Sequence, residues 1–334
     1  MTEKDNLLKK LTKYGMVNSF TSLLRSIFRV RESIMVVLIL ITCVIMTLLS
    51  PYFLSSTNFL AIARGFSMEG IVTIGMVLLL IAGAFDLSVG SVMAFTGIIT
   101  AILITDMNLP YVVAVLGGLL TGLFIGFING LMVTRLRINP LIATLGMMTI
   151  IRGMALGFTE GKPVINVPLN FAWLGQGSIA QIPVPFIIMF VIALIVDFFL
   201  RRGRTLRQLY YVGGNQRAAR LSGIPVDRIM LLSFVGTGVA AALGGILSMA
   251  RLTSGIPTAY AGVELRVIAA CVIGGSSMSG GEGTVFGGLL GLVFMALVSN
   301  AMTLLGVSVY WEGVVTGTIL VVAVGLDMLS RRRL

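Results

Sequence analysis

Long apolar runs occur throughout this sequence, separated by short polar segments that hold most of its charges. A helix needs about 20 apolar residues to cross a lipid bilayer. Only 11% of the residues are charged, against about a quarter in a typical soluble domain. The sequence therefore predicts an all-α polytopic membrane protein with about ten transmembrane helices. The ten candidate runs are 34–54, 66–84, 88–106, 110–134, 141–158, 183–200, 229–251, 263–278, 282–303 and 310–329.

Two junctions between these runs are too polar and too rich in glycine for a regular membrane helix. Non-helical backbone at membrane depth is tolerated only where protein or water surrounds it. We therefore expect broken or re-entrant helices near 84–91 and 274–284. The notable residues of the two junctions are Asp86, Ser88, Gly90, Ser91, Gly274, Gly275, Gly280 and Gly281.

Glycines at four-residue spacing lie on one face of the fourth apolar run. They are Gly122, Gly126 and Gly130. Small residues at this spacing open a groove in which another helix backbone can pack closely. We expect a structural role for them.

Lysine and arginine cluster in four polar segments, at 1–32, 135–137, 201–228 and 331–334. Positive residues mark the cytoplasmic ends of membrane helices. If the N-terminus is cytoplasmic, the fourth, sixth and tenth runs also end on that side, which agrees with an even number of spans. We therefore expect a cytoplasmic segment over 1–32, one transmembrane domain over 33–330, and a cytoplasmic tail over 331–334.

The segment 201–228 differs sharply from the apolar runs on both sides. It holds seven arginines against one aspartate, and a helix-compatible piece from Asn215 to Leu221 precedes Gly223. Membrane topology explains the arginines, so the uncharged residues carry the more specific signal. Small residues allow the backbone of a partner to approach closely. We expect the contact with a partner at Gly214, Asn215, Ala218, Ala219 and Gly223.

Charged side chains at membrane depth normally face a cavity or a partner. Asp86 either caps the following helix or lies on a transport pathway, and the sequence leaves both readings open. Arg152 interrupts the fifth run, and we expect Glu69, Asp86 or Glu264 to pair with it, either structurally or beside a substrate. Arg266, two residues after Glu264, could likewise belong to a structural ion pair or lie beside a substrate.

Several kinds of chemistry are excluded by composition. The sequence has no histidine, and its two cysteines, Cys43 and Cys271, lie within apolar runs. This argues against His/Cys metal sites, histidine catalysis and a disulfide framework. A phosphate-binding G-x-x-x-x-G-K-[ST] motif is also absent, so we expect no enzymatic activity, no cofactor and no metal in this chain. ATP hydrolysis would require a separate chain.

Four sequence blocks together carry a resemblance that covers roughly 35–330. Over this range the chain resembles the inner-membrane permease subunits of bacterial ATP-binding-cassette (ABC) importers for monosaccharides of the ribose, arabinose, galactose and xylose type. Within this group, the residues of its motifs are most similar to those of arabinose permeases. The blocks are 83–91 (GAFDLSVGS), 138–146 (INPLIATLG) with Arg152 and Gly153, the segment 203–224, and 264–275 followed by 279–284.

The resemblance implies a permease that passes a monosaccharide, with a pentose favoured, into the cytoplasm by alternating access. The implied partners are a cytoplasmic ATPase, a periplasmic or lipid-anchored sugar-binding protein and a second permease copy; no nucleic acid is involved. The segment 201–228 would be the loop that couples to the ATPase. Its candidate residues are Gly203, Arg204, Gly213, Gly214, Asn215, Ala218, Ala219, Leu221 and Gly223. Candidates for the pathway or gate are Asp86, Ser88, Gly90, Ser91, Thr144, Arg152, Glu264, Gly274, Gly275, Gly280 and Gly281.

One alternative belongs to a different functional class. A stand-alone secondary transporter or channel would use Asp86, Glu264 and Arg152 as an ion-coupled relay. The patterned loop and the four blocks favour the ABC importer.

Overall fold

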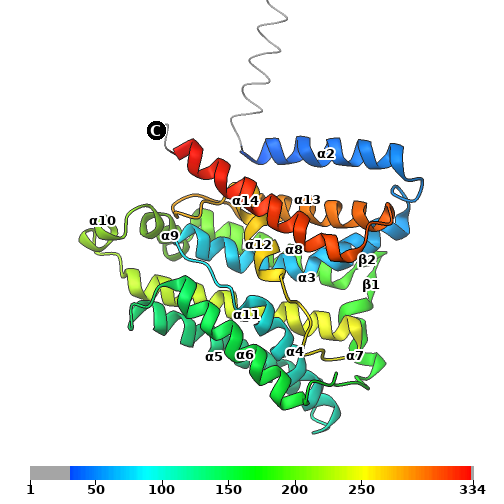
Figure 1. Cartoon of the computed structure of the whole chain (residues 1–334). Coiled ribbons are helices and arrows are strands. Elements are labelled where there is room, and N and C mark those ends of the chain that lie inside the picture. Colours follow the sequence, from blue (N-terminus) through cyan, green and yellow to red (C-terminus); the bar gives the residue numbers. More distant parts are fainter. Residues whose placement is uncertain (1–30, 332–334) are drawn as a thin grey trace, which may run out of the picture.

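The computed structural model describes residues 31–331, and helices dominate this part of the chain (Figure 1). Of the predicted cytoplasmic segments 1–32 and 331–334, residues 1–30 and 332–334 lie outside the described residues. The helices are α2 (Arg31–Leu49), α3 (Ser56–Ile81), α4 (Val89–Thr105), α5 (Tyr111–Thr134), α6 (Pro140–Thr159), α7 (Leu169–Gln176), α8 (Val184–Arg202), α9 (Arg204–Gly214), α10 (Gln216–Leu221), α11 (Val226–Leu252), α12 (Val263–Ile273), α13 (Val285–Leu304) and α14 (Glu312–Arg331). A short 3-10 helix, η1 (Val309–Trp311), precedes α14. Two-residue strands, β1 (Ser178–Ile179) and β2 (Ile182–Pro183), form an antiparallel hairpin.

Each of the ten predicted apolar runs coincides with one of these helices, which confirms a multi-pass helical membrane protein. Within the described residues, six helices are long and apolar enough to cross a membrane: α3, α5, α6, α8, α11 and α13. Three further apolar helices are shorter, and they fall within α2, α4 and the η1–α14 segment. Helix α12 has only 11 residues. The total of ten crossings stays a prediction.

Helix α11 lies at the centre of one half of the fold and packs against α3, α4 and α5. The predicted glycine groove accounts for its contact with α5. A Cβ atom at Gly122 would collide with the carbonyl oxygen of Gly238, and one at Gly126 with the carbonyl oxygen of Phe234. The two backbones therefore approach more closely than larger side chains would permit.

Both predicted helix breaks are confirmed. Helix α3 ends at Ile81 and α4 begins at Val89, while α12 ends at Ile273 and α13 begins at Val285. Gly83 and Gly280 adopt left-handed backbone, at φ +83° and +87°, a conformation that residues with a side chain rarely adopt. The two breaks also touch, because the backbone nitrogen of Gly281 donates to the carbonyl oxygen of Ile81 at 2.8 Å.

The two ends of the bundle carry different elements. In Figure 1, α10 lies at the same end as the start of α2 and the end of α14, while α7, β1 and β2 lie at the opposite end. We refer to these as the α10 end and the α7 end.

Candidate functional site

Helix α9 is amphipathic, and one of its faces is anchored in the protein. Leu209 and Val212 are at most 1% exposed, whereas Arg204 and Tyr211 are exposed. Residues three apart share a helix face, which accounts for the burial of the first pair. Gly203 has extended backbone between α8 and α9 and separates the two helices. A movement of α9 would therefore be transmitted to the packed interior.

The C-terminal half of α9 packs on both helix breaks. A Cβ atom at Gly213 would collide with the carbonyl oxygen of Ile81 and crowd the backbone nitrogen of Gly281, the two atoms that join the breaks. The Tyr210 hydroxyl donates to the carbonyl oxygen of Gly283 at 2.8 Å. Burial raises the pKa of Tyr210 above its ordinary value.

Helix α10 is a short, capped turn that extends from the bundle. The Asn215 side chain accepts a hydrogen bond from the backbone nitrogen of Ala218, an arrangement typical of a helix N-cap. Gly223, at φ +79°, reverses the chain after the helix ends at Leu221. An exposed ion pair of 2.6 Å joins Arg220 to Asp227. The predicted helix from Asn215 is thus confirmed, with Asn215 as its cap.

The predicted coupling residues separate into three groups by burial. The exposed ones are Arg204, Gly214, Asn215, Ala218, Leu221 and Gly223. Gly203 and Gly213 are partly buried. Ala219 is only 4% exposed and belongs to the hydrophobic core. The Ala219 side chain therefore packs inside its own chain, and the partner contact predicted at this position stays a prediction.

Asp86 lies in a buried polar cluster at the first break. Its side chain is 1% exposed and accepts hydrogen bonds from the backbone nitrogen of Ser88 at 2.7 Å and from the Ser88 hydroxyl at 2.6 Å. The Asn129 amide donates to the second carboxylate oxygen at 3.0 Å and to the Ser88 hydroxyl at 2.9 Å. These hydrogen bonds hold the turn before α4 rather than cap the helix, because Ser88 is the N-cap and no side-chain hydrogen bond caps it. A place for Asp86 on the pathway stays a prediction. Sequence analysis missed Asn129, whose only signal is a lone amide in an apolar helix.

Arg152 forms hydrogen bonds with carbonyl oxygens, and Glu264, one of the three expected acidic partners, interacts with its charge without a direct ion pair. One guanidinium nitrogen, Nη1, donates to the carbonyl oxygens of Pro257 and Ala259, both at 2.7 Å. Glu264 instead accepts from the backbone nitrogen of Gly262 at 3.1 Å. Arg152 therefore ties α6 to the segment between α11 and α12.

The other pathway candidates lie at close backbone contacts. A Cβ atom at Gly90 would collide with the carbonyl oxygen of Tyr260, and one at Gly274 with that of Gly287. Thr144 is buried, and its hydroxyl donates to the carbonyl oxygen of Pro140 at 2.8 Å in its own helix. Ser91 is 1% exposed, and its hydroxyl has no partner among the described residues.

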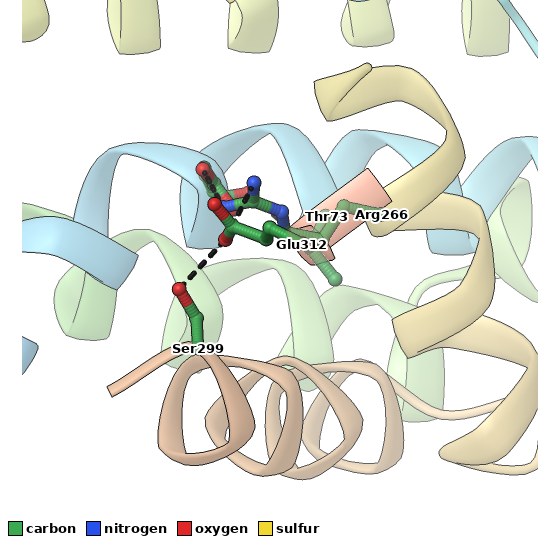
Figure 2. A network of polar contacts seen from close by, with 5 residues as sticks. Thr73, Arg266, Ser299 and Glu312 are labelled. Carbon is green, nitrogen blue, oxygen red and sulfur yellow. Dashed lines mark hydrogen bonds and ion pairs between the residues drawn. The ribbon is translucent and has the colours of Figure 1, made fainter. Parts of the chain in front are cut away.

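A charged network joins helices that are far apart in the sequence. Arg266 of α12 reaches Glu69 of α3 at 3.1 Å through Nη1 and Glu312 of α14 at 3.0 Å through Nη2. The Ser299 hydroxyl of α13 donates to Glu312 at 2.6 Å. Figure 2 shows the Arg266 and Glu312 side chains meeting between their helices, with Ser299 below them. The side chains are 17–26% exposed, so each charge is partly removed from water and depends on its partner for compensation.

This network borders a polar pocket of about 420 Å³. Arg251 and Thr303 lie in the last turns of α11 and α13, so the pocket is in the half of the bundle nearer the α7 end. The volume is within the range of small-molecule sites. None of the predicted pathway residues lines it; the polar and charged lining residues are Glu69, Ser248, Arg251, Tyr260, Arg266, Ser299, Asn300 and Thr303.

Comparison with known proteins identifies the family. Residues 58–324 match the family described as the permease component of the branched-chain amino acid transport system. The chain belongs to this permease family. It is 37% identical to the ribose import permease protein RbsC of Escherichia coli K12 over 302 residues, which cover 89% of this chain and 93% of the relative. It is 35% identical to the L-arabinose ABC transporter permease protein AraH of Azospirillum brasilense over 304 residues, covering 91% and 89%.

A third relative is named for a six-carbon sugar. The D-allose transport system permease protein AlsC of Escherichia coli K12 is 35% identical over 293 residues, covering 88% of this chain and 90% of the relative. No solved structure gives a significant match. The relatives are named as permeases rather than enzymes, and this family member is accordingly a non-enzymatic, multi-pass membrane permease.

Proposed function

We propose that the chain is the permease subunit of an ATP-driven importer that carries a monosaccharide into the bacterial cytoplasm. The relatives named for ribose, L-arabinose and D-allose support this substrate class. Among monosaccharides we propose a pentose, because ribose and arabinose are pentoses. The observation that carries the ATP-driven part is the contact of α9 with both helix breaks, since it gives a cytoplasmic motor a mechanical route into the bundle.

The partners follow from this function. An ATPase on a separate chain would bind the exposed residues of α10 on the cytoplasmic side of the inner membrane, and a sugar-binding protein would dock at the α7 end. The basic segment 201–228, which includes α10, supports this orientation, with both termini cytoplasmic. A second permease copy would complete the transport unit.

The proposed mechanism is alternating access. Closure of the ATPase displaces α10, and the short connection through Asn215 passes the movement to α9. Gly213 and Tyr210 then shift the two breaks, which reorients α3, α4, α12 and α13 around the passage. The polar pocket beside Arg266 would receive the sugar from the α7 end, where its carboxylate, guanidinium and amide groups can bind hydroxyls.

A bulky side chain at Gly214, the last residue of α9, tests whether the ATPase docks beside α10. A Cβ atom here would meet no atom within 4 Å, so the Gly214→Trp permease is expected to fold normally. An indole on this exposed position would block close approach of the ATPase, and we expect loss of ATPase co-purification and of sugar uptake. Gly214→Ala is the matched control and should retain both. Wild-type co-purification by the tryptophan variant would remove Gly214 from the docking surface.

A further inference from the structure

A basic groove lies where α8 meets α9, and apart from Tyr210 its lining residues have no part in the proposed function. Its volume is about 390 Å³, and Leu200, Arg201, Arg207, Tyr210 and Tyr211 line it. Its lining residues belong to the end of α8 and to α9, and none of them belongs to α10, whose exposed residues would contact an ATPase.

The groove and its surroundings hold more arginines than acidic side chains that pair with them. Arg201 pairs with Asp197 at 2.7 Å, and the Arg202 guanidinium lies 5.5 Å from the centre of the Phe198 ring. Within residues 31–331, Arg202, Arg204 and Arg207 have no ion pair. Guanidinium groups present several donors in one plane and match the oxygens of a phosphate.

Exposed aromatic side chains lie next in sequence to the groove-lining residues Leu200 and Arg201. Phe198 and Phe199, in the last turns of the membrane-spanning candidate α8, are 52% and 51% exposed, and Tyr211 is 58% exposed. Large apolar rings at the end of such a helix contact acyl chains and the headgroup region. A soluble anion would gain nothing from these rings, whereas a phospholipid would use both the rings and the arginines.

We propose that this groove binds the phosphate headgroup of an anionic phospholipid. Arg207 and Arg201 hold the phosphate oxygens, and Phe198 and Phe199 contact the acyl chains. Basic pockets beside membrane helices bind anionic headgroups in this way. The bound lipid fixes the first turn of α9 relative to α8, at the opposite end of α9 from Gly213.

Lipid binding to the purified, detergent-solubilised permease tests this site. Titration with phosphatidylglycerol, phosphatidylcholine or inorganic phosphate, followed by native mass spectrometry and thermal unfolding, should show selective binding and stabilisation by phosphatidylglycerol. The Arg207→Gln variant should bind it about fivefold more weakly, and Arg207→Lys should keep most of the affinity. Arg217→Gln removes an equivalent exposed charge from α10 and should bind like the wild type.

Three outcomes would overturn the proposal. Equal binding of phosphatidylcholine would show that the arginines do not select the headgroup. Equal loss of affinity in Arg207→Gln and Arg217→Gln would indicate diffuse attraction to the whole loop. Stabilisation by inorganic phosphate as large as that by phosphatidylglycerol would identify a site for a soluble anion instead.

Discussion

The Gly213→Val permease is expected to lose sugar uptake together with part of its stability. The valine side chain would collide with the carbonyl oxygen of Ile81 and displace the backbone of Gly281, so the contact of α9 with both breaks would be forced apart. Overpacking of this kind costs about 1–3 kcal/mol of unfolding free energy. Uptake by cells and thermal unfolding of the purified protein measure the two effects.

Gly214, the residue after Gly213, provides the control for this prediction. Gly214→Val adds the same side chain one residue later, where a Cβ atom meets nothing within 4 Å, and its thermal stability should equal that of the wild type. A Gly213→Val permease with normal stability and normal uptake would contradict the proposed route from α9 to the breaks.

The second large effect is expected at Arg266. Replacement by glutamine leaves the partly buried carboxylates of Glu69 and Glu312 without their shared cation. Breaking a fully buried pair costs about 3–5 kcal/mol, and the partial exposure reduces the expected loss here to about 2–3 kcal/mol. Uptake should fall as well, because the network borders the polar pocket. Denaturant-dependent unfolding in detergent measures the loss of stability.

Two further variants test whether the network needs the guanidinium geometry of Arg266 or only its positive charge. Arg266→Lys should recover only part of the stability, because one ammonium cannot reproduce the two-pronged contact with both carboxylates. Adding Glu69→Gln to Arg266→Gln removes one unpaired charge and should make the double variant more stable than Arg266→Gln alone. If the double variant is less stable, then the carboxylates do not require Arg266 for compensation.

The sequence predicts most of the local structure because the determining patterns are themselves local. Apolar runs give the positions of the helices, and the polar, glycine-rich stretches give both breaks. The spacing of Gly122, Gly126 and Gly130 predicts a groove, and Asn215 before a short helical piece predicts the start of α10. Each of these features depends on neighbours within one or two turns.

The candidate site was less predictable because its contacts join distant residues. Glu69 and Arg266 are 197 positions apart, and nothing local indicates that they meet. Arg152 finds carbonyl oxygens more than 100 positions away, a partner type that a search for opposite charges does not consider. Ala219 resembles an exposed contact residue in sequence, yet the fold turns it inward.

Uptake by a reconstituted system tests the central claim most directly. Proteoliposomes would hold the permease with its ATPase, with the sugar-binding protein on the α7 side and ATP on the α10 side. We predict accumulation of a labelled pentose that requires ATP, the ATPase and the binding protein, and that persists when ion gradients are dissipated. Uptake that continues without the ATPase and stops when an ion gradient is collapsed would contradict the account and identify an ion-coupled transporter.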